Sequence, residues 1–148
     1  MKKVYSLLAF LVCGLIGVQA AAVAWADAGM FLWVADGGVI DKAAIESAES
    51  LSFEGIQGFM IHGMNGMMVI PVVAVALLVV SFFAKVPKGA VWAGAVVALV
   101  ALQVTLGLLG HEFAISALFH GMNALVLFTV ALLTGLRGGR VSGRVAVD

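Results

Sequence analysis

The sequence predicts an all-α integral membrane protein, a four-helix bundle made of two tandem helical-hairpin repeats. Hydrophobic residues make up 64% of the 148 residues and charged residues 11%, which is too little polar surface for a soluble domain of this size. Four apolar segments reach the roughly 20 residues that a helix needs to cross a bilayer. They are continuous rather than alternating, which favours helices over barrel strands. The phrase His-Gly-Met-Asn occurs twice, at 62–65 and 120–123, and indicates an internal duplication.

The segments follow one another with one long connection. We expect a single domain over residues 1–148, with spans at 4–26, 59–84, 91–110 and 113–136, an outer acidic loop at 27–58 and a cytoplasmic tail at 137–148.

The first span has a second interpretation. Lys2 and Lys3 precede an apolar stretch that ends in the Ala-Trp-Ala of residues 24–26, which also fits a cleavable signal peptide. The apolar stretch is longer than a usual signal core. Cys13, the single cysteine, excludes an internal disulfide and is expected to be a small buried residue.

The long loop predicts a surface helix. Residues 40–55 are rich in alanine and glutamate, and the apolar residues Ile45, Leu51 and Phe53 favour a short amphipathic helix on the outer surface. The aromatic-rich run 31–33 is expected at the membrane interface, where amphipathic aromatic side chains gather.

The charges are distributed unevenly over the loops. Seven of the eight basic residues fall on one side of the four spans: Lys2, Lys3, Lys85, Lys88, Arg137, Arg140 and Arg144. The loop 27–58 holds Lys42 and six acidic residues. The positive-inside rule therefore predicts a bacterial inner-membrane protein with both termini in the cytoplasm. The short basic tail is expected to contact anionic lipid, and it carries no sign of a nucleic-acid site.

The duplication extends beyond the histidine phrase. Aligning the two phrases pairs the second span with the fourth, and each remaining span then carries one glutamine among apolar residues, Gln19 and Gln103. Two hairpins of like orientation are related by a pseudo-two-fold axis along the membrane normal. This pairing favours retention of the first span.

The repeated phrase predicts a cofactor site near the outer side. Polar residues within a span are costly and favour function, and His62 and His120 occupy matched positions on two spans. A neutral imidazole binds iron, and its other ring nitrogen needs an acceptor to fix the tautomer. Gly63 and Gly121 would let a flat macrocycle approach the backbone. The asparagine three residues after each histidine, Asn65 or Asn123, lies on nearly the same helix face.

One spacing opposes this interpretation. His62 stands 23 residues before Lys85, whereas His120 stands 17 residues before Arg137. If the basic residues mark equivalent helix ends, the two rings differ in height by about 9 Å at roughly 1.5 Å per residue. Pro71 is expected to kink the second span below His62 and to open the local packing.

Two metal alternatives remain open. Met60, Met64 and Met68 stand four residues apart, with Met67 adjacent, and thioether ligands beside His62 suit Cu(I). The Met-x-x-x-Met pair in a span also resembles that of eukaryotic copper transporters. The same methionines fit flexible filling of a core.

A zinc site is the other metal alternative. It would use His111, Glu112 and His120, whose spacing matches no known ligand pattern. A purely structural subunit is the alternative without any cofactor, because polar side chains within spans commonly hydrogen-bond between helices.

The chain resembles one half of the haem A synthase family. Those proteins consist of two similar four-helix bundles, each with haem-ligating histidines on its second and fourth helices, which implies that His62 and His120 hold haem iron. Gly63 and Gly121 stand where that family typically has arginine, and Phe59 stands where it has glutamate. The resemblance therefore implies no catalytic role. The chain is also similar to small four-span proteins of actinobacteria and relatives with a His-span-Gln-span-His pattern, which implies a fold and no function.

The leading prediction is a b-type haem held between the second and fourth spans by His62 and His120. Met64 and Met122 would pack around it, and the two glutamines would face it. The expected role is electron transfer, or an accessory part in a respiratory or haem-handling complex, as a homo-oligomer or with a membrane partner. Motifs for phosphate binding, a nucleophile elbow or a zinc protease are absent, which argues against an enzyme acting alone.

Overall fold

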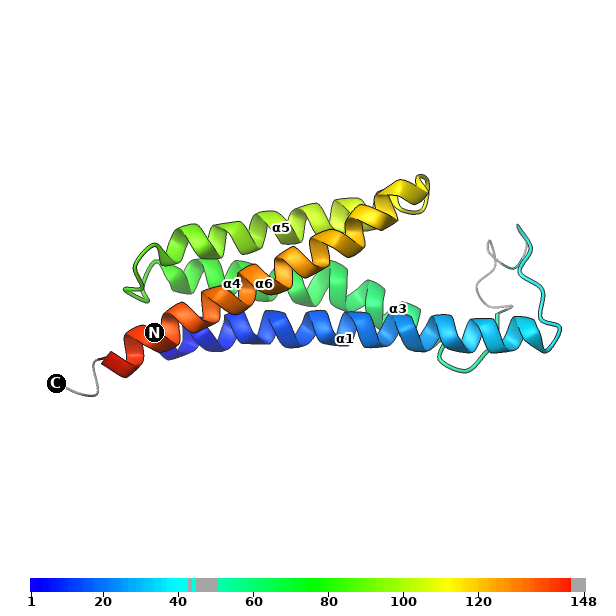
Figure 1. Cartoon of the computed structure of the whole chain (residues 1–148), viewed down its shortest axis with the longest axis horizontal. Helices are drawn as coiled ribbons and strands as arrows, with labels where there is room; N and C mark the ends of the chain where they lie inside the picture. Colours follow the sequence, from blue (N-terminus) through cyan, green and yellow to red (C-terminus); the bar gives the residue numbers. More distant parts are fainter. Residues whose placement is uncertain (43, 45–50, 145–148) are drawn as a thin grey trace. The chain divides into compact units, whose positions relative to one another are not determined.

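The computed structural model describes residues 1–42, 44 and 51–144, and this part of the chain contains helices and no strand (Figure 1). The elements are α1 (Lys2–Ala35), α3 (Gln57–Met64), the π-helix η2 (Asn65–Val69), α4 (Ile70–Ser81), α5 (Gly89–Leu109) and α6 (Ala114–Arg144). Four stretches of the described chain are long and apolar enough to cross a membrane: Lys2–Ala35, Gln57–Ser81, Gly89–Leu109 and Ala114–Gly139. The predictions of an all-α chain and of four such helices are confirmed.

Two helices run beyond the predicted spans. α1 continues past Ala26 to Ala35, and α6 continues past Leu136 to Arg144. The predicted ends were placed at the first charged residues, but a charge limits the part of a helix that crosses hydrocarbon and does not stop backbone hydrogen bonding. The first residues of the predicted outer loop, 27–35, are therefore helical. The amphipathic helix expected within 40–55 falls partly outside the described residues, and residues 51–56 are not helical.

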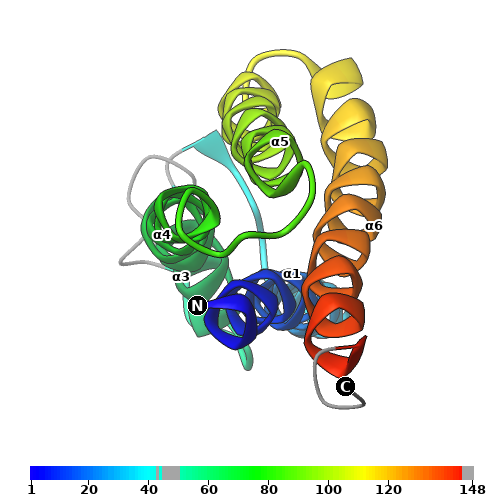
Figure 2. The same cartoon turned by 90° about the vertical axis from the view of Figure 1, so that its left-hand side faces the viewer.

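The chain divides into two compact units, a larger one of Met1–Ile16 with Gly66–Asp148 and a smaller one of Gly17–Asn65. In the larger unit, α5 packs against both α4 and α6, which lie on either side of it (Figure 2). The largest fully buried side chains are all in this unit: Tyr5, Val12, Leu77, Val96, Leu127 and Thr134. Cys13 is buried and forms no disulfide, as predicted, and its Sγ lies 3.7 Å from the carbonyl oxygen of Phe128.

Small residues bring the helices of the larger unit together. Tyr5 donates a hydrogen bond from its hydroxyl to the main-chain oxygen of Gly89, at 3.1 Å. A side-chain carbon at Gly135 would lie 2.6 Å from the ring of Phe10, so only glycine fits that position without movement. Close approach at small residues is the usual basis of helix packing in lipid, where apolar burial supplies little driving force between helices.

The smaller unit holds α3 against the second part of α1. Gly58 faces the main-chain oxygen of Ala22, and a side-chain carbon there would also reach 3.0 Å from the Cβ of Ala26. Phe53 links this contact to the loop, because its ring centroid lies 6.1 Å from that of Trp33 and 6.3 Å from that of Phe59. These contacts place His62 of α3 against α1.

The helical stretch from Gln57 to Ser81 is interrupted by one π-turn, η2. Pro71 follows it in the first turn of α4. Within a regular α-helix, Pro71 would leave the carbonyl of Met67 without its donor, and its ring would crowd that oxygen. The first turn of a new helical segment tolerates the missing N–H. The span therefore changes helix type directly before Pro71, and the kink expected there stays a prediction.

Candidate functional site

His120 of α6 and Gln103 of α5 form two hydrogen bonds that connect these helices. The Nδ1 of His120 lies 3.0 Å from the main-chain oxygen of Gln103, and the Nε2 of Gln103 donates to the main-chain oxygen of His120, also at 3.0 Å. A carbonyl oxygen only accepts, so Nδ1 of His120 carries a proton. The imidazole is thereby held in the tautomer whose basic nitrogen is Nε2.

Asn123 completes this cluster from α6. Its Nδ2 donates to the Oε1 of Gln103 at 2.6 Å and to the main-chain oxygen of Leu99 at 3.0 Å. Asn123 is 7% exposed, so these bonds satisfy an amide that has been removed from solvent. The side chain of Gln103 is therefore fixed at both of its polar atoms.

Gly107 makes room for the ring of His120. A side-chain carbon at Gly107 would lie 3.1 Å from Cε1 and 3.2 Å from Nδ1 of His120. Sequence reasoning missed this residue. The available signal is its place one helical turn after Gln103, on the same face of the span.

His62 occupies a similar position in the smaller unit. Its Nδ1 lies 3.3 Å from the main-chain oxygen of Gln19, so this ring also donates from Nδ1 to the carbonyl of a glutamine on the facing helix. The side chain of this glutamine differs from its counterpart. The Oε1 of Gln19 is buried and has no hydrogen-bond partner among the described residues, whereas the Oε1 of Gln103 accepts from Asn123.

The acceptor for each ring thus comes from the facing helix. The sequence placed Asn65 and Asn123 on nearly the same helix face as the histidines, three residues further on. The structure instead pairs each Nδ1 with a main-chain oxygen, at Gln19 or Gln103. Both asparagines are equally buried, at 7% exposure.

The residues beside the histidines lie on open surface. A side-chain carbon at Gly63 or Gly121 would have no other atom within 4 Å. Met64 and Met122, the next residues along, are 58% and 56% exposed. In each phrase the glycine and the methionine therefore face away from the protein, while the asparagine faces inward.

Some buried positions of the first two helical stretches recur in the last two. Three of those in α1, Tyr5, Ala9 and Val12, are matched 84 residues later in α5 by Gly89, Ala93 and Val96, whereas the other buried positions of α1 have no buried counterpart at that spacing. In the stretch from α3 to α4 the buried positions are Gly58, Asn65, Ile70, Ala74, Leu77 and Ser81, and in α6 they are Asn123, Leu127, Ala131, Thr134, Gly135 and Gly138. From Asn65 and from Asn123 onward, and with Gly135 set aside, the two series have the same steps except the first, which is five residues in one and four in the other.

The π-turn accounts for this single extra residue. η2 covers residues 65–69, the interval in which the two series differ. A π-turn accommodates one additional residue without changing which positions face inward beyond it.

The height difference of about 9 Å was expected only if Lys85 and Arg137 mark equivalent helix ends. Basic residues do not mark equivalent helix ends here, because α4 ends at Ser81 whereas α6 continues to Arg144. His62 and Ser81 are separated by one residue more along the chain than His120 and Gly138, which are the matched positions of the second series.

The alternative metal sites fare differently. Among the described residues, no group of three or more His, Cys, Asp or Glu side chains is placed to hold a metal, so the structure does not support the zinc site from His111, Glu112 and His120. His111 lies exposed in the turn between α5 and α6. The methionines do not fill a core, because they are all more than half exposed: Met60, Met64, Met67 and Met68.

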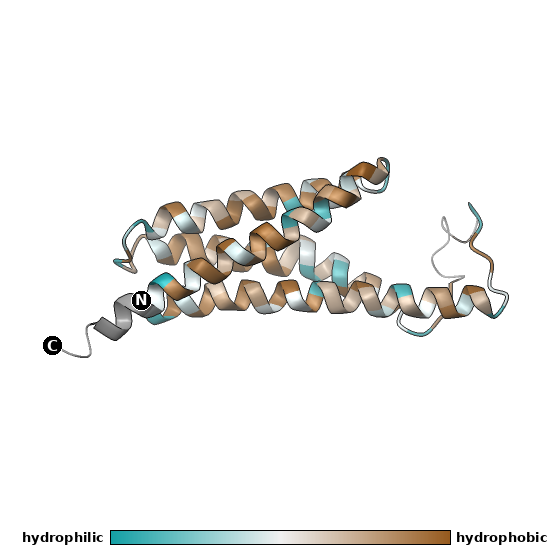
Figure 3. Cartoon of the chain, in the orientation of Figure 1, coloured by the Kyte–Doolittle hydropathy of each residue, from teal (hydrophilic) through white to brown (hydrophobic). Residues whose placement is uncertain are grey.

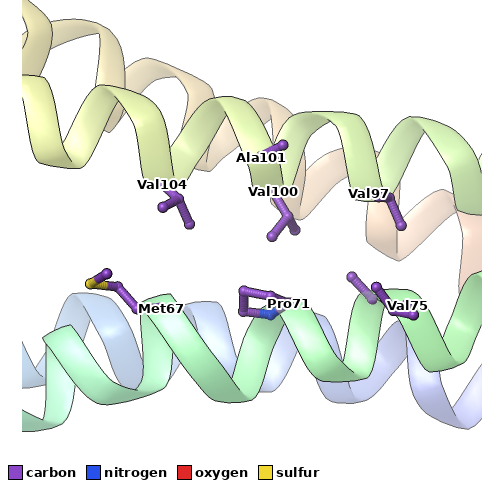
Figure 4. Close-up of a pocket in the computed structure, with 8 residues that line it drawn as sticks. Met67, Pro71, Val75, Val97, Val100, Ala101 and Val104 are labelled. Carbon is purple, nitrogen blue, oxygen red and sulfur yellow. The ribbon is translucent and has the colours of Figure 1, made fainter.

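One apolar groove lies between α4 and α5, close to η2. It has a volume of about 390 Å³, and Met67, Pro71 and Val75 face Val100 and Val104 across it (Figure 4). No histidine, glutamine or asparagine lines it. The groove is therefore separate from the histidine clusters.

Comparison with protein-family models, with curated proteins and with solved structures finds no match for this chain.

Proposed function

We propose that this protein binds a b-type haem with His62 and His120 as axial ligands and serves in membrane electron transfer, either by itself or as an accessory part of a respiratory or haem-handling complex. One observation carries the proposal. Both imidazoles donate from Nδ1 to a main-chain oxygen of a matched glutamine, Gln19 or Gln103. Histidines that bind metal through Nε2 are almost always held in this way.

The surroundings of the histidines fit a flat macrocycle. Gly63 and Gly121 face open space, which leaves room for a ring system against the backbone. Met64 and Met122 present exposed apolar side chains on the same segments. The residues of this chain would hold and orient the imidazoles and exclude water, and a bound haem would supply reversible one-electron transfer.

The recurrence of the buried positions supports two tandem helical-hairpin repeats. α1 and α5 share three buried positions at a spacing of 84 residues, and most steps along α6 match those of α4 once the π-turn is allowed for. A duplicated hairpin would carry a duplicated ligand. In this proposal the residue inserted at η2 is a later change in the first repeat.

We place the protein in a bacterial inner membrane with both termini in the cytoplasm. Four apolar helices support the assignment to a membrane. Seven of the eight basic residues lie on one side of these helices in the predicted topology, which supports the orientation. The acidic loop then lies outside, and the histidines lie in the outer part of their helices.

An optical spectrum tests the proposal. Protein purified in detergent from haem-replete cells should show sharp reduced-minus-oxidised bands of a bis-histidine b-type haem. His62→Ala and His120→Ala should each abolish the low-spin bands, because one axial ligand is lost. His111→Ala is the matched control, since this histidine lies exposed in a turn, and it should leave the spectrum unchanged.

Two results would overturn the proposal. A flat spectrum from folded protein that was purified from haem-replete cells would exclude haem binding. Copper that copurifies with the protein and is lost in a Met64→Leu and Met68→Leu double variant would favour Cu(I) instead. Circular dichroism and elution volume of each variant distinguish loss of the ligand from loss of the fold.

A further inference from the structure

Three segments of the larger unit meet at one end of it: the start of α1, the turn between α4 and α5, and the last turns of α6. The hydroxyl of Tyr5 bonds to Gly89, directly after the turn. A side-chain carbon at Gly138 would lie 3.0 Å from the Tyr5 ring and 3.4 Å from the main-chain oxygen of Lys2. Each of these segments carries basic residues, so the contacts bring Lys2, Lys88 and Arg137 to the same end.

Arg137 is held in place by an aromatic ring. Its guanidinium carbon lies 4.1 Å from the ring centroid of Trp92, in the first turn of α5, while the arginine side chain remains exposed. Stacking on a ring restricts the guanidinium and leaves the N–H groups at its edge directed outward. Such a planar fork matches the oxygens of a phosphate.

The turn between α4 and α5 places two lysines in an unusual backbone conformation. Lys85 has a φ of 52° and Lys88 a φ of 56°, and both side chains are exposed. Residues other than glycine and asparagine adopt the left-handed region rarely, because Cβ crowds the backbone. Lysine occupies both positions despite this cost, and such strained positions gather at functional sites.

Among the described residues of the larger unit, no carboxylate lies near these cations. Within residues 1–16 and 66–144, the one acidic residue is Glu112, which follows the far end of α5. The 21 residues of α5 place it about 30 Å from Lys88. Figure 3 shows hydrophilic residues at the α4–α5 turn beside the apolar lengths of the helices. In addition, the Oγ of Ser6 faces Gly138 and is buried with no hydrogen-bond partner among the described residues.

Large apolar side chains border the basic end. Phe82 and Phe83 are exposed immediately before Lys85, and Val91 and Leu136 are exposed beside Trp92 and Arg137 in sequence. A soluble anion needs only the cations, whereas a phospholipid also needs an apolar surface for its acyl chains. The combination of cations, an interfacial tryptophan and exposed apolar side chains is typical of a lipid-binding position.

We propose that Lys85, Lys88 and Arg137 form a binding site for the phosphate of an anionic phospholipid, with the acyl chains along the apolar side chains of α4 and α5. The site requires that this end of the helices lies at the membrane surface, and it is independent of haem binding.

Lipid retention measures the site. The detergent-purified protein is incubated with phosphatidylglycerol or phosphatidylcholine, and the bound lipids are counted by native mass spectrometry. The wild-type protein should prefer phosphatidylglycerol. Each of Lys85→Gln, Lys88→Gln and Arg137→Gln should weaken this preference about fivefold, the typical effect of one basic residue at an anionic membrane surface. Lys42→Gln is the matched control outside the site and should leave the preference unchanged.

Lys88→Gly separates binding from folding. Glycine tolerates a positive φ, so this variant should melt at a higher temperature than the wild type while it binds phosphatidylglycerol more weakly. A structural role for Lys88 would instead lower both. Equal retention of the two lipids, or an unchanged preference in the triple Gln variant, would overturn the proposal. Displacement of the lipid by inorganic phosphate at equal concentration would show a site for free phosphate instead.

Discussion

Gln103 and His120 are joined by two reciprocal hydrogen bonds of 3.0 Å, in each of which one residue supplies a side-chain donor and the other a main-chain oxygen. The arrangement ties α5 to α6 and sets the tautomer of the ring at the same time. In its counterpart, Nδ1 of His62 lies 3.3 Å from the main-chain oxygen of Gln19. The two clusters share the orientation of the histidine and differ in how firmly the glutamine side chain is held.

This difference predicts that removing the two glutamine side chains changes the free energy of unfolding by different amounts. Gln103→Leu loses the bonds to His120 and Asn123, and hydrogen bonds between membrane helices contribute about 0.6 kcal/mol each on average. We expect a loss of about 1 kcal/mol in the free energy of unfolding. Gln19→Leu removes a buried oxygen that has no partner and should be neutral or stabilising. Thermal melting in one detergent compares them, and equal destabilisation would contradict the different environments.

The contact between Gly107 and His120 predicts a steric effect on the ring. In Gly107→Ala the new methyl carbon would lie 3.1 Å from Cε1 of His120, so the imidazole must move. We expect weaker or broadened low-spin haem bands and a longer bond to Gln103. Gly94→Ala is the control on the same helix, because it has no atom within 4 Å and should stabilise α5 by up to about 1 kcal/mol. Identical spectra for both variants would show that the His120 ring accommodates the methyl group without moving, and would contradict the prediction.

The π-turn predicts that one residue can be removed from the helical stretch 57–81 at a single place. Deleting Gly66 should convert η2 into a regular turn and give both series of buried positions the same steps. Deleting Val75 instead rotates Leu77 and Ser81 out of the core by about 100°, one residue of a 3.6-residue turn. The first variant should fold and the second should not, as judged by monodisperse elution and helicity. The prediction fails if both deletions are tolerated equally.

The close contact between α6 and α1 predicts that substitutions at two adjacent glycines of α6 change the stability differently. Gly138 faces Ser6 and the ring of Tyr5, whereas Gly139 has no atom within 4 Å of a side-chain carbon. Gly138→Val should therefore destabilise the protein by about 1–3 kcal/mol through overpacking. Gly139→Ala should be neutral or slightly stabilising, because alanine is the better helix former. The melting temperatures of the two variants test the contact directly, and equal values would argue against it.

Several features could be predicted from the sequence because they depend on composition and on residue type. Continuous apolar runs determine that helices form and that four of them can cross a membrane, since lipid leaves the backbone no other way to satisfy its hydrogen bonds. The correspondence of Gln19 with Gln103 followed from the repeated phrase, and in the structure each of them lies against the histidine of its own hairpin.

Only the tertiary structure shows which atoms of the glutamines and histidines are in contact. A main-chain oxygen is present at every residue, so no pattern of residue types indicates that Gln19 and Gln103 receive the imidazoles through their backbones. The helix ends also differed from prediction, because α1 and α6 continue past the charges that end the apolar runs. The extra residue at η2 became evident only from which side chains are buried, since burial depends on contacts between segments distant in the sequence.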